Sequence, residues 1–297
     1  MLKMKQAVVA AMAVAGVALV ASCSSGSAGA SDGNGANGAN GSYGECEVFG
    51  AKGSVKLKPA TAGELTVQTN LPSPGWWKGT SPTDITGGYE YCLAANIAHR
   101  AGLSKVNVQN VSFDALVAGQ TKGYDMAMAQ ISVTPEREKV VTFSAPYFDS
   151  NLGVLAPAVS DVTADNIRSK KIGVQVGTTS VDWAEKELKP SGAPHLFQDT
   201  TSMVTAVTSG LADVAVQDTA IMLGFAKNSG GSLKVVGQYE TGQHYAAIYE
   251  KDSPNAAAIN EAIEAMRKDG TLDKLSAKWL GPELGGDPNA VPVWSLK

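Results

Sequence analysis

The stretch SFDALVAGQTKGYDMAMAQISVTPEREKVVTFSAPYF (Ser112–Phe148) carries the pattern that decides the fold. Ser112 is a typical helix cap for the short apolar run that Gly119 ends, and an apolar strand over 124–132 follows. That strand leads almost directly into Arg137, a permanent cation. Because a charge at the end of a buried strand needs a counter-charge, Arg137 is a candidate functional residue.

Strand and helix signals also alternate upstream of this stretch. A buried strand is predicted over 64–70, and a helix over 90–101 has Leu93, Ile97 and Ala101 at four-residue spacing. The segment VNVQNV (106–111) reads as the next strand. Together with Ser112–Phe148, these segments form a β-α-β-α-β run, which predicts a parallel sheet with helices on its faces.

A second, smaller α/β unit follows the aromatic end of the opening stretch. Its strands are predicted over 172–176, 195–198, 212–218 and 233–237, with helices over 181–189, 200–210 and 219–227 between them. Two further helices follow, capped by Ser253 and Thr271 and ended by Gly270 and Gly281.

This helical tail predicts that the first lobe is discontinuous. The chain would leave lobe 1 near Phe148, build lobe 2, and return near His244–Ile248. The fold class is therefore α/β, with two lobes, each a parallel-rich sheet flanked by helices, joined by a two-crossing hinge. The predicted limits are 56–149 for lobe 1, 150–244 for lobe 2 and 245–297 for the second part of lobe 1. The cleft between two such lobes is the expected ligand site.

The amino-terminal region has the pattern of a secretory signal. Lys3 and Lys5 precede an apolar run, and Cys23 follows Val-Ala-Ser, so 1–22 are interpreted as a lipoprotein signal peptide. Acylation of Cys23 would anchor the protein to the membrane; the alternative is an ordinary signal cleaved near the same place. Because the next residues are nearly all Gly, Ser, Ala and Asn, 23–55 are assigned to the lipidated Cys and a flexible linker.

Charge and histidine placement exclude two classes of protein. The 24 Lys and Arg residues, against 28 Asp and Glu, form no basic stripe, so no nucleic-acid partner is expected. His99, His195 and His244 lack metal-ligand spacing, so neither a metal nor another cofactor is expected. With Cys23 used for lipid, Cys46 and Cys92 would bridge in an oxidising compartment, unless Cys92 is simply a buried helix residue and Cys46 is unpaired.

Five segments, taken in order, resemble one known family. They are GGYEYCLAANIAHRAG, SFDALVAGQTKGYDMAMAQISVTPEREKVVTFSAPYF, VGTTSVDWAE, GLADVAVQDTAI and AMRKDGTLDKLSAKWLG, and they span about 63–281. The chain is similar to the polar amino-acid branch of bacterial extracytoplasmic solute-binding proteins of ABC importers, which have the type II periplasmic-binding fold. Cys92 departs from the family pattern, which usually has a carboxylate there.

The resemblance implies a function and its partners. It implies an extracytoplasmic, membrane-anchored, monomeric lipoprotein that captures a free amino acid and delivers it to a permease with its ATPase. Two alternatives stay open at this point. One is a ligand-binding sensory module, and the other is an enzyme like the secreted cyclohexadienyl dehydratases of this fold, for which only Glu90 or Asp218 could transfer a proton. The expectation is that the chain is not an enzyme.

A free amino acid is a zwitterion, so its site needs a cation and an anion. Arg137 can grip a carboxylate with two parallel hydrogen bonds, although it could instead form a surface ion pair. The resemblance implies that Ser132 helps hold the carboxylate, that the Gln130 carbonyl accepts from the ammonium, and that Asp218 is the ammonium's partner. Asp218 could also cap a helix, which is compatible. Thr179 follows a Gly-Thr turn rich in amide N–H groups, which could bind the carboxylate or be a plain turn.

The side-chain pocket is expected to contain aromatic residues. Phe113 and either Trp76 or Trp77 are predicted to line it, unless they pack within their own domain. The resemblance suggests that Asn70 disfavours Lys, Arg or His as the ligand, because binders of cationic or amide ligands often have Asp there. Gln175 and Gln217 offer neutral contacts, and Lys78 could reach an acidic ligand. The expected ligand is therefore a neutral polar or acidic amino acid, whereas Trp183, Trp279 and Trp294 are expected only to pack.

Overall fold

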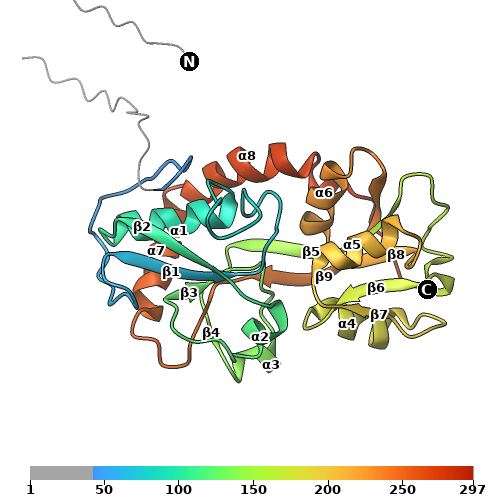
Figure 1. The fold of residues 1–297 in the computed structure, drawn as a ribbon, viewed down its shortest axis with the longest axis horizontal. Helices are drawn as coiled ribbons and strands as arrows, with labels where there is room; N and C mark the ends of the chain where they lie inside the picture. The colour runs from blue at the N-terminus through green and yellow to red at the C-terminus, as the bar shows by residue number, and fades with distance from the viewer. Residues whose placement is uncertain (1–42, 297) are drawn as a thin grey trace, which may run out of the picture. The chain divides into compact units, whose positions relative to one another are not determined.

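The computed structural model describes residues 43–296. These residues form two five-stranded sheets with flanking helices (Figure 1). The first sheet has the order β2-β1-β3-β10-β4 and the second the order β7-β6-β8-β5-β9. Each sheet is the centre of one lobe, which confirms the predicted two-lobe α/β fold. The first sheet comprises β1 (Glu64–Thr69), β2 (Lys105–Asn110), β3 (Met126–Ala127), β4 (Thr142–Phe143) and β10 (Ile248–Tyr249). The second comprises β5 (Phe148–Pro157), β6 (Ile172–Gln175), β7 (His195–Phe197), β8 (Val214–Asp218) and β9 (Leu233–Tyr245).

The parallel core of lobe 1 follows the predicted β-α-β-α-β run. β1 pairs in parallel with β2 on one side and with β3 on the other. β10 then pairs antiparallel with β3 and β4, so the chain that returns from lobe 2 completes the sheet. The helices are α1 (Tyr89–Arg100), α2 (Phe113–Val117), α3 (Pro135–Glu138), α7 (Ala256–Lys268) and α8 (Thr271–Leu284).

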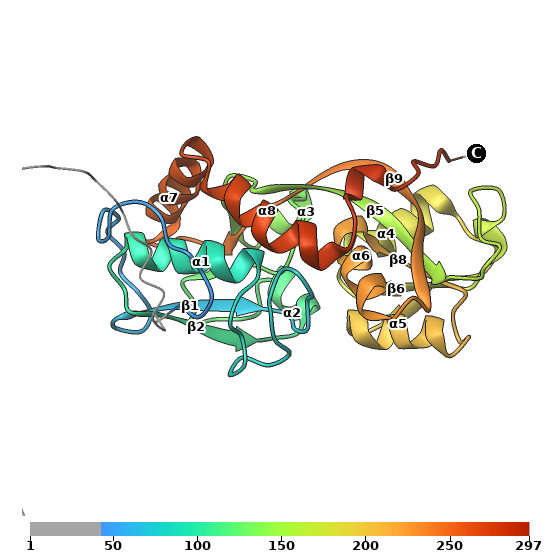
Figure 2. The same ribbon diagram turned by 90° about the horizontal axis from the view of Figure 1, so that it is seen from above.

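Two clusters of buried apolar residues form the core of lobe 1. The larger joins β1 to α1, α7 and α8 through side chains such as Leu93, Ile263 and Leu275, and α1 and α8 lie on the same side of β1 and β2 in Figure 2. The smaller places Phe113 and Leu116 of α2 against buried strand residues. In both clusters, apolar helix side chains pack against apolar strand side chains. Burial of these side chains is the main favourable contribution to folding.

Lobe 2 is a mixed sheet with helices α4 (Thr179–Trp183), α5 (Thr200–Thr208) and α6 (Thr219–Asn228). α4 continues as a π-helical turn over Ala184–Leu188, and short 3₁₀ turns occupy Ile167–Ser169 and Pro288–Ala290. β6 pairs in parallel with β7 and β8, whereas β5 pairs antiparallel with β8 and β9. The carboxyl ends of β6 and β8 therefore lie at the same edge of the sheet.

β5 and β9 carry the two predicted crossings between the lobes. They pair antiparallel from Phe148 opposite Tyr245 to Pro157 opposite Leu233. β9 is 13 residues long, so the strand predicted over 233–237 was too short. The second half of β9 is polar, so no apolar pattern predicts a strand there. That half is a strand because it pairs with β5.

The structure adds a third connection that the sequence did not predict. After α8 the chain crosses back to lobe 2, where Gln238 N–H donates to Pro292 O at 2.9 Å and Trp294 N–H donates to Gln238 O at 2.7 Å. The Trp294 indole packs edge-on against Tyr239, as expected of a packing residue. The segment 245–297 therefore belongs to lobe 1 only up to the end of α8.

The end of α8 itself differs from the sequence prediction. Gly281 does not end the helix, which continues to Leu284 and stops at Gly285, where φ is 67°. Leu284 is buried in the lobe 1 core, so the extra turn covers apolar surface.

The folded part begins before the predicted limit of lobe 1. Within 43–55, Phe49 N–H donates to Asn96 Oδ1 at 2.7 Å and Val55 N–H donates to Arg100 O at 2.8 Å. Cys46 and Cys92 form a disulfide that ties this segment to α1. Residues 43–55 are therefore part of the folded region, and their assignment to the linker was wrong. The predicted signal peptide, Cys23 and the rest of the predicted linker lie outside the described residues.

Candidate functional site

A small cavity of about 20 Å³ is lined by residues of both lobes at the carboxyl ends of their strands. Fifteen residues line it. Lobe 1 supplies Asn70, Pro72, Ser73, Phe113, Ala129, Gln130, Ser132 and Arg137. Lobe 2 supplies Gln175, Thr178, Thr179, Thr200, Gln217, Asp218 and Ile221. This volume holds about one water molecule, so the lobes would have to move apart to admit a larger ligand.

The residues next to Arg137 in the chain hold it in the short helix α3. Thr134 caps this helix by accepting from Arg137 N–H at 3.2 Å, and Pro135 occupies the first helical turn. The guanidinium is buried, donates through Nη1 to Ser132 O at 2.6 Å, and stacks 5.5 Å from the Phe113 ring centroid. Burial lowers the pKa of Arg137 to about 10, so the group stays positively charged at neutral pH.

Arg137 also reaches across to the other lobe. Its Nη2 donates to Gly177 O at 2.8 Å, in the turn between β6 and α4. A second bridge lies beside it, because Gln243 Oε1 accepts from Ser132 Oγ and from Thr179 Oγ1, both at 2.8 Å. These bonds hold the two lobes together on the Arg137 side of the cavity.

Asp218 is the anionic counterpart on lobe 2. It ends β8 and begins α6, but its side chain does not cap that helix. Its Oδ1 is buried and has no hydrogen-bond partner among residues 43–296. Burial raises the pKa of Asp218 to about 6, although hydrogen bonding by Tyr245 and the charge of Arg137 act in the opposite direction. A buried acceptor without a partner is costly, and a donor supplied by a ligand would relieve that cost.

Gln130 adopts an unusual backbone conformation where the chain leaves β3. Its φ is 51°, in the left-handed region that side chains other than Gly seldom occupy. The buried carboxylate of Glu90 fixes it, accepting from Gln130 N–H at 2.9 Å and from Gln130 Nε2 at 2.5 Å. Gln130 lies three residues after the end of β3, and Ser132 and Arg137, which also line the cavity, follow it in the chain.

Glu90 is the centre of a polar network beneath the cavity. Trp77 Nε1 donates to it at 2.8 Å and the Tyr147 hydroxyl donates to its other oxygen. Burial raises the pKa of Glu90, whereas these hydrogen bonds lower it. Glu90 accepts four hydrogen bonds in all, two from Gln130 and one each from Trp77 and Tyr147, and these orient Gln130 against the core. Glu90 itself does not line the cavity.

The model of the family described as "Bacterial extracellular solute-binding proteins, family 3" matches residues 73–282, which include nearly all of both lobes. The chain belongs to this family.

The chain is also similar to several named proteins and solved structures. The L-cystine-binding protein TcyJ of Escherichia coli is 27% identical over 202 residues, which are 66% of this chain and 75% of TcyJ. The amino-acid-binding protein AabA of Dichelobacter nodosus is 34% identical over 206 residues, covering 67% of this chain and 79% of AabA. An ancestral arginine-binding protein solved with arginine is 32% identical with a TM-score of 0.66, and the match covers 74% of this chain and 99% of that one.

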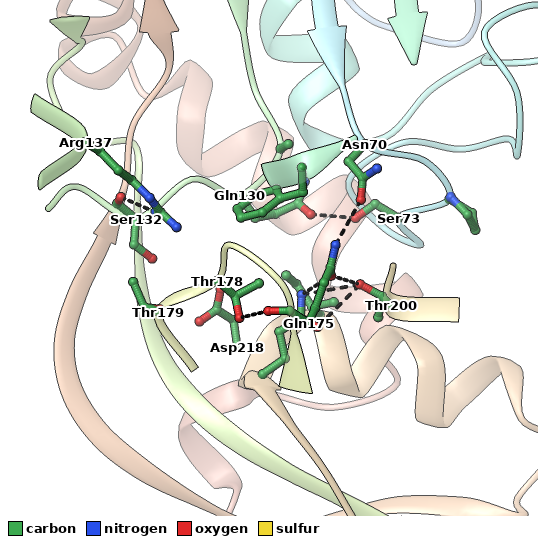
Figure 3. A pocket seen from close by; sticks show the side chains of 15 residues that line it. Asn70, Ser73, Gln130, Ser132, Arg137, Gln175, Thr178, Thr179, Thr200 and Asp218 are labelled. Carbon is green, nitrogen blue, oxygen red and sulfur yellow. Dashed lines mark hydrogen bonds between the residues drawn. The ribbon is translucent and has the colours of Figure 1, made fainter. Parts of the chain in front are cut away.

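In this family 3 protein, most of the predicted site residues come together. Arg137, Ser132, Gln130, Asp218, Thr179 and Phe113 all line the one cavity. Figure 3 shows Arg137, Ser132 and Thr179 on one side and Asn70, Ser73 and Thr200 on the other. The cavity therefore has a charged side and a neutral polar side.

The prediction that Trp76 or Trp77 lines the pocket is wrong for this cavity. Both indoles are fully buried in the core of lobe 1. Trp76 packs edge-on against Tyr89 and Phe148, and Trp77 is held by Glu90. Because these contacts bury both rings within lobe 1, neither reaches the cavity wall. Lys78 is also outside it, since its ammonium is bound to Glu45 at 2.8 Å on the surface.

Sequence reasoning missed several polar residues of this site. Ser73 and Thr200 line the cavity, and Gln243 bridges the lobes beside it. Ser73 lies in a Pro-rich loop and Gln243 lies in the polar half of β9. In such polar segments the sequence does not distinguish a site residue from its neighbours. Only the position of Thr200, two residues after the predicted strand over 195–198, marks it as a residue near the sheet edge.

Within residues 43–296, no helix has the length and apolar composition needed to cross a bilayer. The same residues contain no group of acidic, His and Cys side chains arranged to hold a metal ion.

Proposed function

We propose that this protein captures a free α-amino acid between its two lobes and delivers it to an ABC importer. One observation carries the proposal: Arg137 and Asp218 line the same cavity from different lobes, yet no ion pair within residues 43–296 joins them. Two unpaired, opposite charges in one cavity suit a zwitterion, because each charge of the ligand would replace a missing partner.

The ligand's carboxylate would bind on the Arg137 side. The guanidinium offers charge-assisted hydrogen bonds, each contributing about 1.5–3 kcal/mol. The hydroxyls of Ser132 and Thr179 lie on the same side and would turn from Gln243 Oε1 towards the carboxylate.

The ligand's ammonium would bind to Asp218. Its free Oδ1 would accept one N–H, and the Gln130 carbonyl would accept another. Because Arg137 comes from lobe 1 and Asp218 from lobe 2, the ligand binds the closed arrangement better than an open one and shifts the population towards it. Phe113, stacked on Arg137, would form the apolar wall of the site.

Transport also needs a membrane location. We propose that residues 1–22 are a signal peptide, that Cys23 carries the lipid anchor, and that the Gly, Ser and Asn residues after it form a linker. The partners would be a permease and its ATPase, with the protein acting as a monomer. The names of the curated relatives support the amino-acid ligand.

Titration calorimetry with the common L-amino acids tests the proposal. At least one should bind to the wild-type protein, and Arg137→Ala should abolish that binding while the circular dichroism spectrum is kept. Arg168→Ala is the matched control, because Arg168 lies on a 3₁₀ turn of lobe 2 outside the cavity. Normal binding by the Arg137→Ala protein would show that the site is assigned wrongly.

A further inference from the structure

The neutral side of the cavity contains one hydrogen-bond acceptor and one donor that face each other from different lobes. Asn70 Oδ1 of lobe 1 accepts from Gln175 Nε2 of lobe 2 at 3.4 Å (Figure 3). A hydrogen bond of this length is weak, because N–H···O bonds in proteins are normally 2.7–3.2 Å long.

Neighbouring groups fix which end of the Asn70 amide faces the cavity. Asn70 Nδ2 donates to Val111 O at 2.9 Å, within lobe 1. The amide nitrogen is thereby held against the backbone, so the oxygen is left to point towards Gln175.

The orientation of Gln175 is fixed in the same way. Its Oε1 accepts from Thr200 Oγ1 at 2.8 Å and from Gln217 Nε2 at 3.2 Å. Its nitrogen therefore faces Asn70, where it makes only 3.4 Å contacts to Asn70 Oδ1 and Gln198 O. The cavity thus presents an acceptor from one lobe and a donor from the other, both weakly used.

We propose that this side of the cavity binds a side-chain carboxamide, so that the ligand is L-glutamine or L-asparagine. This inference rests on the proposed function. A carboxamide carries an N–H₂ donor and a C=O acceptor on one carbon. Its N–H₂ donates to Asn70 Oδ1 and its C=O accepts from Gln175 Nε2, so it replaces one weak bond between the lobes by two good ones.

Charged side chains do not fit this arrangement. The cavity walls, as far as residues 43–296 form them, carry only Arg137 and Asp218 as charged groups, and both serve the ligand's own carboxylate and ammonium. A cationic side chain would face the Gln175 N–H₂ donor without a carboxylate, and an acidic one would face Asn70 Oδ1 without a cation. Burying a charge without a partner is costly, so both are rejected.

Calorimetry with matched ligands tests the inference on the wild-type protein. L-Glutamine is compared with L-glutamate and L-methionine, which have similar shape, and with L-arginine; L-asparagine is compared with L-aspartate and L-leucine. A carboxamide ligand should bind at least about 10²-fold more tightly than each of its comparators, because they leave buried polar groups unpaired or bring an unpaired charge.

A variant converts the proposed acceptor into an anion. Asn70→Asp should weaken binding of the carboxamide ligand about tenfold or more and strengthen binding of L-arginine. The control is Asn228→Asp, which makes the same charge change at an exposed position at the end of α6 and should leave all affinities unchanged.

The outcomes separate this inference from the proposed function. If L-arginine, L-glutamate or L-methionine binds to the wild-type protein as tightly as the carboxamide, and binding still depends on Arg137, the carboxamide inference is overturned while the proposed function stands. If no amino acid binds at all, both are overturned.

Discussion

Arg137 and Asp218 line one buried cavity from opposite lobes without pairing with each other. Arg137 instead donates to the carbonyls of Ser132 and Gly177, and Asp218 Oδ1 has no partner among the described residues. Ionised Asp218 is therefore poorly compensated, which the raised pKa of this carboxyl, about 6, reflects.

Ligand affinity should fall in mild acid. Below pH 6 the Asp218 carboxyl takes up a proton and loses the charge that attracts the ligand's ammonium. Affinity should therefore drop about tenfold between pH 7 and pH 5, since an amino acid does not titrate in that range. Calorimetry across this range, with circular dichroism to monitor the fold, measures the effect. A constant affinity would contradict the role of Asp218.

Asp218→Asn should stabilise the protein without ligand while it abolishes binding. The folded-state pKa is raised, so the contribution of Asp218 to stability is fully present below the unfolded pKa, near 3.8, and is lost as pH rises through about 6. At pH 7 a neutral amide avoids this loss, and the free energy of unfolding should rise by about 1–3 kcal/mol. Urea unfolding at pH 7 and pH 4 measures it.

The gain should be smaller at pH 4, where Asp218 is already protonated. Asp252→Asn is the control, because Asp252 is exposed and remote from the cavity. A destabilised Asp218→Asn protein at pH 7 would refute the prediction.

Glu90→Gln should damage both stability and binding. The amide would place an N–H₂ group among donors from Trp77, Tyr147 and Gln130. One or two buried donors would lose their acceptor, at a cost of about 2–4 kcal/mol. Because Glu90 also holds Gln130 in its left-handed conformation, ligand affinity should fall as well.

Chemical unfolding and calorimetry check these two effects of Glu90→Gln. Glu187→Gln, at an exposed position after α4, is expected to change neither. An unchanged free energy of unfolding in the Glu90→Gln protein would show that the network does not support the fold.

Trp294→Ala should destabilise the protein through the third connection. The half-buried indole packs on Tyr239, and a Cβ added at Gly237 would collide with it. Its removal should cost about 1–3 kcal/mol, less than for a fully buried Trp. Gly237→Ala should have an effect of the same sign.

Val293→Ala is the control for the third connection, because the neighbouring Val293 side chain is exposed. Thermal or urea unfolding measures all three variants. If Trp294→Ala unfolds as the wild-type protein does, the contact of this segment with lobe 2 contributes nothing to stability.

The sequence by itself determined the two α/β lobes, the crossings at β5 and β9, and most of the charged side of the cavity. Apolar periodicity indicates which faces are buried, and the order of strands and helices then implies a parallel sheet whose strand ends lie together. Arg137 could be named because it follows a predicted buried strand, whereas Asp218, the last residue of β8, was named through the resemblance to the family.

Only the tertiary structure decided which buried residues face the cavity. Trp76, Trp77 and Phe113 are all apolar and buried, yet only Phe113 lines it, because Glu90 and the ring of Phe148 hold the two indoles in the core. The length of β9, the third connection and the facing of Asn70 and Gln175 arise from pairing between residues far apart in the chain. The local sequence pattern indicates that a side chain is buried. The residues that this side chain contacts depend on how segments far apart in the chain pack together.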